Sequence, residues 1–435
     1  MYSPLIAALV VGALFAAPAE AAPAPVSSHA MIHACCTPDA LAERIFMESR
    51  ALGARFVRVD FELDSVFEDY GGGPRAEPSW ASVDRVVALA RRHQLGVLGI
   101  LLAPPAYLTT CPERWPDARR CAAADPEEFG RLAGLVAERA RTRITHWEIL
   151  NEPDGAWAFE GSPEEYARML SAAYDAIKAR VPAATVVMGG VQSPHVSPWL
   201  DRVLTTGDAA RSFDVANVHL RGPLGAVVAR YAEFRSRLAG RGFRGPVWVT
   251  EHGYPADPAY QSDPGYRGGE AQQAAYLTQS IVGLGEAGAE QVFVTLRDNL
   301  SGQYASEGLV HIGETAGYLV RRRPSFAAVR RLVASWDQLM AWRAEQRRFE
   351  ALERTHVDAL ALARVHVKIA RRRFRSARAL IHSLQRRGRG REASELLSEA
   401  RTALGWRRAY VAYERTRAAL AGLAAADMRR RIAGS

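Results

Sequence analysis

Short β-rich runs and amphipathic helical runs alternate along the chain from about Ser28 to Ser335. This alternation is typical of a parallel α/β fold, because two parallel strands need a long crossover between them and a helix usually supplies it. The expected strands are Met31–Ala34, 55–63, 96–104, 144–150, 185–191, 213–220, 246–254 and 291–298. The first of these is the most weakly marked.

Apolar residues at helical spacing occupy the segments between the expected strands. The expected helices are 38–53, 80–95, 125–141, 162–181, 226–240, 268–288 and 324–335. Asp125 before Pro126 and Ser162 before Pro163 are clear helix starts. Strands and helices in this order over roughly 300 residues predict a (β/α)8 TIM barrel. A doubly wound open sheet is the alternative, but it usually has a glycine-rich first turn, which the sequence lacks.

The first residues are typical of an export signal. The run from Pro4 to Pro18 is almost wholly apolar but too short to span a membrane, and Ala19-Glu20-Ala21 has the small-residue pattern of a cleavage site. We therefore expect a signal peptide at 1–21, a loose leader at 22–29, the barrel at 30–335 and a separate region at 336–435. The exported chain is expected to be secreted or associated with the cell envelope, with no transmembrane segment after the signal.

The chain has four cysteines, Cys35, Cys36, Cys111 and Cys121. Export favours disulfides, but four cysteines allow three connectivities and the sequence does not choose among them. Cys111 and Cys121 lie in one loop-like stretch and are able to close it locally, whereas a bond between the neighbours Cys35 and Cys36 is strained. Because no CxxC or paired-histidine spacing accompanies these residues, we expect neither a metal nor another cofactor.

The last hundred residues differ in composition from the rest of the chain. Residues 337–435 hold 23 Lys/Arg against 10 Asp/Glu, a net charge of +13, whereas the remainder has a net charge of −4. Their apolar spacing predicts an α-helical hairpin or coiled coil, with helices at about 337–386 and 392–432 and a break at Gly388–Gly390. Two interpretations stay open: a surface for an anionic cell-envelope polymer, or a solvated helix face. Export argues against nucleic acid.

Two glutamates follow apolar strands at the positions where barrel enzymes place catalytic groups. Glu152 comes just after the fourth expected strand, and Glu251 follows the apolar run of the seventh. Each alone is as well explained by an exposed loop carboxylate. Together, at the ends of two separated strands of one barrel, they predict a pair that faces across a cleft. Hydrolysis of a glycoside needs such a pair, one carboxylic acid to protonate the leaving oxygen and one carboxylate to attack the anomeric carbon.

At these positions the chain resembles the clan A retaining glycoside hydrolases, and most closely family 39 and its family 5-like relatives. Asn151-Glu152-Pro153 and Thr250-Glu251-His252-Gly253 are the motifs of the resemblance, which covers about residues 30–335. It implies that Glu152 is the acid/base, that Glu251 is the nucleophile and that Asn151 binds the sugar 2-hydroxyl.

The same resemblance assigns two further residues. Arg58, on the second strand, matches the arginine that holds the nucleophile ionised, and His219, on the sixth, matches a histidine that lines the sugar subsite. A structural salt bridge for Arg58 and a satisfied core histidine for His219 are the alternatives. The implied substrate is a carbohydrate.

The sequence departs from the family at its aromatic positions. Arg221 stands where an aromatic residue usually follows the strand-six histidine, and the eighth strand ends without the usual tryptophan. We therefore expect Tyr107, Trp157 or Tyr254 to stack on the sugar. A non-catalytic carbohydrate-binding barrel is the second hypothesis, although such proteins usually lose one carboxylate and this chain keeps both.

Overall fold

The structure is a computed structural model that describes residues 23–192, 198–257, 269–298, 304–313, 318 and 320–341, with scattered positions from 343 to 398. Residues 23–335 form one compact unit. The predicted signal peptide and most of the predicted C-terminal hairpin lie outside the described residues. No helix within the described ranges is long and apolar enough to cross a membrane.

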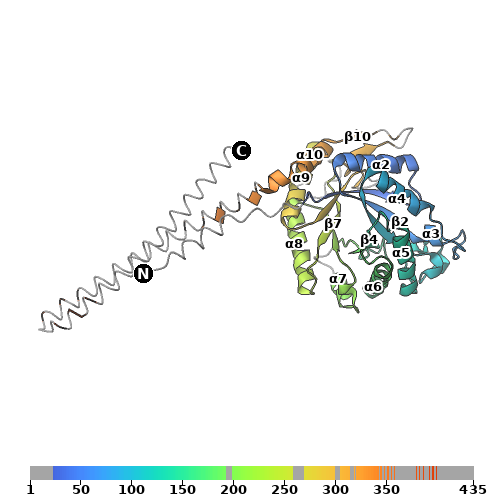
Figure 1. Ribbon diagram of the computed structural model, residues 1–435, viewed down its shortest axis with the longest axis horizontal. Helices are drawn as coiled ribbons and strands as arrows, with labels where there is room; N and C mark the ends of the chain where they lie inside the picture. The colour runs from blue at the N-terminus through green and yellow to red at the C-terminus, as the bar shows by residue number, and fades with distance from the viewer. Residues whose placement is uncertain are drawn as a thin grey trace. The chain divides into compact units, whose positions relative to one another are not determined.

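Eight parallel strands form the barrel at the centre of this unit (Figure 1). They are β1 (Val26–His33), β2 (Phe56–Glu62), β3 (Gly96–Leu102), β4 (His146–Ile149), β5 (Thr185–Met188), β6 (Ala216–Leu220), β7 (Val247–His252) and β8 (Gln291–Thr295). Their order is β5-β4-β3-β2-β1-β8-β7-β6, and parallel bridges between Val187 and Val215 and between Val191 and Val218 close β5 onto β6. The prediction of a (β/α)8 barrel is confirmed.

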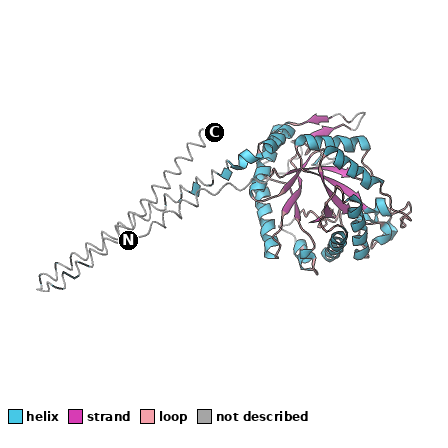
Figure 2. Cartoon of the chain, in the orientation of Figure 1, coloured by secondary structure: helices cyan, strands magenta, loops and turns pink. Residues whose placement is uncertain are grey.

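Helices surround the strands on the outside (Figure 2). They are α2 (Asp39–Leu52), α3 (Leu63–Phe67), α4 (Ala81–His93), α5 (Pro126–Ala140), α6 (Pro163–Arg180), α7 (Trp199–Thr205), α8 (Leu224–Gly240), α9 (Glu270–Glu286) and α10 (Pro324–Ala334). Short 3-10 turns span Ala106–Leu108, Pro112–Arg114, Asp117–Arg120 and Ala209–Arg211.

The predicted helix starts at α5 and α6 are confirmed by their hydrogen bonds. Asp125 accepts from the first free backbone N–H groups of α5, and Ser162 forms a reciprocal capping box with Glu165 at the start of α6. Both helices have proline in their first turn, where no hydrogen bond is lost. These local signals fix where the chain turns from the loops beyond β3 and β4 into the outer layer.

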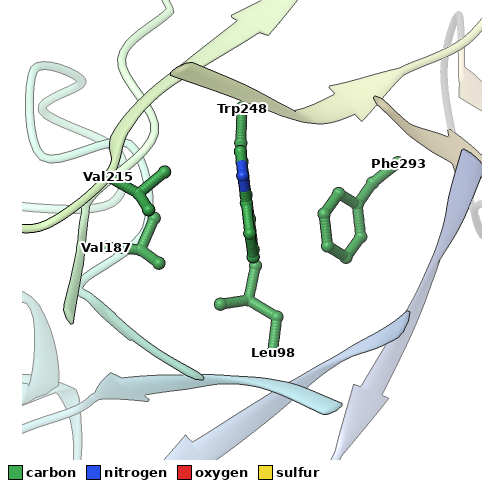
Figure 3. Close-up of a cluster of buried hydrophobic side chains, with 5 residues drawn as sticks. All are labelled: Leu98, Val187, Val215, Trp248 and Phe293. Atoms are coloured by element: carbon green, nitrogen blue, oxygen red, sulfur yellow. The ribbon is translucent and has the colours of Figure 1, made fainter. Parts of the chain in front are cut away.

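A cluster of large apolar side chains fills the N-terminal half of the barrel. Figure 3 shows the Trp248 ring between two valines on one side and Phe293 on the other. The cluster consists of Leu98, Val187, Val215, Trp248 and Phe293, with Phe56 packed against it. This end is filled by packed side chains, and the polar residues lie nearer the C-terminal ends of the strands, where barrels of this kind place their active sites.

The first strand begins earlier than the sequence predicted. It starts at Val26 instead of Met31, so the expectation of a loose leader over 22–29 was wrong for the residues from Val26 onward. Small polar residues suggested a linker, but Ser27 and Ser28 are buried and satisfied by side-chain hydrogen bonds to Gln291 and Ser49. These hydrogen bonds within the protein take the place of the hydrogen bonds to water that the two hydroxyls would make in an exposed linker.

Several short elements were missed by the sequence analysis, among them α3, which directly follows β2. Helix α7 lies between β5 and β6, and an antiparallel pair of strands, β9 (Val310–Ile312) and β10 (Val320–Arg322), precedes α10. Strands of three residues are too short to show a period in the sequence. The structure also pairs the cysteines, as Cys35–Cys36 and Cys111–Cys121, and so selects one of the three connectivities.

Candidate active site

A cavity of about 730 Å³ opens at the C-terminal ends of the barrel strands. Its ionisable wall residues are His29, His33, Arg58, Asp60, Arg119, Arg120, Glu152, His219, Arg221, Arg230, Glu251 and Glu307. Asn151, Trp157, Gln192 and Tyr304 also line it. A cavity of this size is large enough for a small organic ligand, and polar groups that converge in it provide the means to orient one.

Glu251 lies on β7 with each of its carboxylate oxygens bound to a different arginine. Arg58 donates from Nη1 to Oε1 over 2.8 Å, and Arg221 donates from Nη2 to Oε2 over 3.1 Å. Burial raises the pKa of Glu251, but its electrostatic interactions with His219, His29, Arg221 and Arg58 outweigh burial and hold that pKa well below its usual value. Glu251 is therefore a carboxylate at neutral pH.

Arg58 stands at the centre of a buried hydrogen-bond network on β2. Its Nε and Nη2 form a bidentate pair with Glu148 at 2.8 Å each, and Nη2 also donates to Oδ1 of Asn151 over 2.6 Å. Burial lowers the pKa of Arg58, but Glu148 and Glu251 more than reverse this, so the guanidinium stays charged. A planar guanidinium held on several sides positions the carboxylates that it contacts.

Glu152 reaches the cavity from the loop after β4, which has an unusual backbone. Both Leu150 and Glu152 have positive φ, 61° and 43°. Non-glycine residues in this region are strained, and such residues gather at functional sites. The conformation brings the buried carboxylate against His219, whose Nδ1 lies 2.6 Å from Oε1 of Glu152.

A chain of hydrogen bonds behind His219 determines which of its nitrogens carries a proton. Asn217 donates from Nδ2 to Glu148 over 2.9 Å, so its Oδ1 is the acceptor for the hydroxyl of Thr250 at 2.8 Å. Because the Thr250 hydroxyl donates its only proton to Asn217, its oxygen must accept the hydrogen bond from Nε2 of His219 at 3.1 Å. Nδ1 of a neutral His219 is then an acceptor.

The direction of these hydrogen bonds also determines where the proton lies between His219 and Glu152. A short contact between Nδ1 and Oε1 needs one proton between them, and with Nε2 already protonated that proton belongs to the Glu152–His219 pair. The contact between Oε1 of Glu152 and Nδ1 of His219 therefore holds one proton that the two side chains share. Gly190 keeps this arrangement compact, since a Cβ at that position would lie 2.1 Å from Nε2 of His219.

The two glutamates face each other across His219. Nδ1 of His219 is 3.7 Å from Oε1 of Glu251, and one carboxylate oxygen of each glutamate lies within 4.8 Å of the other. The same three side chains also have the donor atoms to hold a metal ion, as does a second group, His33, Asp60 and Glu62.

Arg221, which stands where the family resemblance implies an aromatic residue, contacts two carboxylates. Arg221 bridges Glu251 to a second buried carboxylate, Glu307, with Nε 3.2 Å from both of its oxygens, and its guanidinium lies 4.8 Å from the centre of the Tyr304 ring. Gly253 makes room for Glu307, because a Cβ there would lie 2.3 Å from Oε2. Arg221 therefore contacts the carboxylate of Glu251 at the position where the family resemblance implies an aromatic side chain.

The structure brings most of the predicted site residues together. Glu152, Glu251, Asn151, Arg58, His219 and Trp157 all line the cavity. Tyr107 lies in the turn after β3 and is not among the residues that line it. Tyr254 is buried against Tyr276, with ring centres 4.5 Å apart, and does not line it either. Among the three aromatic candidates, Trp157 has the position for stacking on a sugar.

Glu148, Glu307 and Tyr304 were missed by the sequence analysis. Glu148 carried a signal, because it is a charged residue inside an apolar strand, like Arg58, its partner. Glu307 and Tyr304 carried none, since they lie in a segment without regular structure after β8. They reach the cavity only because this segment folds back over the mouth of the barrel, and the pattern of neighbouring residues in the sequence does not predict such a contact.

Fold and site together define a (β/α)8 barrel with two carboxylates facing across its mouth. No protein-family model and no curated protein matches the chain by sequence. Solved structures match by fold, and several are family 39 glycoside hydrolases. The enzyme from the gut symbiont Bacteroides cellulosilyticus WH2 has a TM-score of 0.54 at 18% identity, over 72% of this chain and 64% of that chain.

Two further family 39 structures are similar. The enzyme from Xanthomonas axonopodis pv. citri has a TM-score of 0.55 at 16% identity, over 74% of this chain and 68% of that chain. A β-xylosidase from Caulobacter crescentus has a TM-score of 0.53 at 17% identity, over 73% of each chain. The chain therefore has the fold of family 39 glycoside hydrolases, although it spans less than two thirds of the enzyme from B. cellulosilyticus.

Proposed function

We propose that the chain is a secreted retaining glycoside hydrolase that cleaves β-linked glycosides or polysaccharides by double displacement. The observation that supports this most is the approach of Glu152 and Glu251 to within 4.8 Å in one cavity. Retaining enzymes hold their two carboxyl groups about 5–5.5 Å apart, whereas inverting enzymes need about 6.5–9.5 Å to admit a water. The spacing therefore favours retention.

In the first step, Glu251 attacks the anomeric carbon and forms a glycosyl ester. The bond from that carbon to the leaving oxygen breaks, its electron pair stays on the oxygen, and Glu152 donates the proton that this oxygen needs. The charge of Arg58 keeps Glu251 ionised for the attack. The Glu152–His219 contact supplies the proton.

In the second step, Glu152, now without its proton, removes a proton from water. The oxygen of that water bonds to the anomeric carbon, and the ester bond to Glu251 breaks. Each step inverts the anomeric carbon, so the two together retain its configuration. Asn151, held by Arg58 at the edge of the cavity, is positioned to bind the sugar 2-hydroxyl, as its family counterpart does.

Aryl β-glycosides provide the direct test. One structural neighbour is named a β-xylosidase and another an exo-β-1,4-mannosidase, so the aryl β-xyloside and β-mannoside come first, followed by plant and microbial polysaccharides. We expect turnover by the native chain and none by Glu251→Gln, which keeps the side-chain shape. Proton NMR of the first-formed sugar should show the β-anomer. Binding without turnover would favour the carbohydrate-binding alternative, and an α-anomer would exclude retention.

Export and the basic region complete the proposal. Cleavage after Ala21 is checked by N-terminal sequencing of protein from the medium or cell envelope.

The net charge of +13 over 337–435 supports contact with an anionic cell-envelope polymer, because opposite charges attract. Such contacts weaken steeply as the salt concentration rises. We expect the full chain, but not a chain ending at Ala341, to bind the polymer at low salt and to release it at high salt. Equal retention of both chains would leave only the solvated-face interpretation.

A further inference from the structure

A second group of ionisable side chains lies at the cavity wall, away from the two catalytic glutamates. His33 ends β1, and Asp60 and Glu62 lie on the neighbouring strand β2, where His33 pairs in register with Asp60. Nδ1 of His33 is 2.7 Å from Oε1 of Glu62 and 3.2 Å from Oδ2 of Asp60. The proposed double displacement uses none of the three.

We propose that His33, Asp60 and Glu62 bind a divalent transition-metal ion of the Zn²⁺ type. This inference goes beyond the proposed hydrolase function and does not rest on it. One imidazole and two carboxylates are ligands that Zn²⁺ and its neighbours accept. Atoms that each lie about 2.0–2.2 Å from one such ion are roughly 3–3.5 Å apart. The three donor atoms here already lie within 4.8 Å of one another, two of the separations being 2.7 and 3.2 Å.

An independent observation concerns the second oxygen of Glu62. The Glu62 side chain is 3% exposed, and its Oε2 is buried without a hydrogen-bond partner among the described residues. A buried carboxylate oxygen left without a partner costs stability, and a bound cation removes that cost. Because the other oxygen of Glu62 contacts His33, the carboxylate is directed into the cluster.

The charges around the cluster favour a cation. Asp60 and Glu62 place two carboxylates beside each other in a poorly solvated site, with side chains 19% and 3% exposed. Arg119, which lines the same cavity, is already paired with Asp64 at 2.6 Å. A metal ion between Asp60 and Glu62 would relieve the repulsion between the two carboxylates.

The ion would remain open to the cavity. His33 and Asp60 line the cavity wall, whereas Glu62 lies behind it. Three protein ligands leave at least one position of a four-coordinate ion free. That position faces the space occupied by substrate, so a hydroxyl of a sugar or a water would complete the site.

Calorimetric titration of the full chain with ZnCl2 tests the proposal, using protein purified without a polyhistidine tag and treated with EDTA. We expect one Zn²⁺ per chain and no comparable binding of Ca²⁺, which prefers six or more oxygen ligands. His33→Ala and Asp60→Asn should each weaken binding at least about 100-fold, since loss of even an outer partner of a metal ligand costs about 10–100-fold.

Two control variants separate this site from others. Glu251→Gln disables the other ligand group, Glu152, His219 and Glu251, and should leave Zn²⁺ binding unchanged. His311→Ala removes an exposed histidine that also contacts a carboxylate, Asp298, and should be equally without effect.

No binding by the native chain, or unchanged binding in His33→Ala, would overturn the proposal. Loss of binding only in Glu251→Gln would assign the ion to the catalytic glutamates and overturn it too. Thermal melting verifies that each variant is folded, and Asp60→Asn keeps the shape of its side chain if His33→Ala does not fold. Because the readout is metal binding, a failure here leaves the hydrolase proposal intact, and absence of turnover leaves this one intact.

Discussion

The guanidinium of Arg221 lies 3.1 Å from Oε2 of Glu251, on the oxygen that Arg58 leaves free. Both oxygens of the proposed nucleophile are thereby bound to a positive charge. Arg221 is itself held by the buried carboxylate of Glu307. The charge on Glu251 is thus stabilised by more than the arginine that the family resemblance assigned to the task.

Replacement of Arg221 should change the pH dependence of activity. Arg221→Gln removes one of the positive charges that lower the pKa of Glu251, so that pKa rises and the carboxylate is lost at a higher pH than in the native chain. We therefore expect the acid limb of kcat/KM against pH to move to higher pH, measured on an aryl β-glycoside.

Arg230→Gln is the matched control. Arg230 lines the same cavity but contacts the backbone oxygen of Arg221, not Glu251, so the acid limb should stay in place. An unshifted limb in Arg221→Gln would show that Arg58 alone keeps the nucleophile ionised.

Beneath the catalytic glutamates, the buried pair of Arg58 and Glu148 should be a major contributor to stability. Both side chains are almost wholly inaccessible to solvent. Breaking such a pair leaves a buried charge without its partner and typically costs about 3–5 kcal/mol. Glu148→Gln should lower the free energy of unfolding by that amount, measured by urea denaturation at neutral pH.

An exposed ion pair of similar geometry is the comparison. Arg139 contacts both oxygens of Asp84 on the outside of the barrel, at 2.8 and 2.6 Å. Because water competes for both charges, Asp84→Asn should change stability very little. A similar loss in both variants would mean that burial of Arg58 and Glu148 adds nothing.

The sequence predicted the parts of this molecule that depend on local pattern. The barrel follows from the alternation of strands and helices, and Glu152 and Glu251 follow from their places at the C-terminal ends of strands. What it missed depends on contacts between distant segments. Glu307 reaches Arg221 across 86 residues of sequence, and Ser27 and Ser28 are buried because β1 lies between β2 and β8.

The sequence also did not predict which of the aromatic candidates points into the cavity. Tyr107, Trp157 and Tyr254 were equivalent by sequence, since each is an aromatic residue just beyond a strand or in a loop. Packing separates them: Trp157 is 59% exposed and lines the cavity, whereas Tyr254 is turned inward onto Tyr276. Which way a side chain points after a strand ends is set by the loop backbone, and composition does not encode it.

The assignment of Glu152 as acid/base is tested by the leaving group. Glu152→Ala should lose hydrolysis of glycosides with poor leaving groups, which need a proton, while the first step survives on activated aryl glycosides, which do not. Azide should then rescue turnover and give a β-glycosyl azide, because it attacks the ester without a general base. Glu160→Ala, at a glutamate in the same loop that does not line the cavity, should behave as the native chain. Equal loss on both substrate types without rescue would contradict the assignment.

Thr250 should affect catalysis although it touches no substrate. Its hydroxyl donates to Asn217 and therefore accepts the Nε2 proton of His219, which leaves Nδ1 free to share a proton with Glu152. Thr250→Val keeps the volume but removes this acceptor. His219 can then carry its proton on Nδ1 and donate it to an ionised Glu152, the state that is unable to act as an acid.

We therefore expect Thr250→Val to lower kcat by roughly 10- to 100-fold on poor leaving groups, a part of the 10²–10⁴-fold that acid catalysis contributes. Activated aryl glycosides should react almost as before in their first step. Thr295→Val is the control, because Thr295 lines the cavity on the next strand but contacts Glu307 and not the histidine. If Thr250→Val instead slowed both substrate types equally, the role of Thr250 would be confined to packing, and the proton on Glu152 would have to be held by His219 without help from the residues behind it.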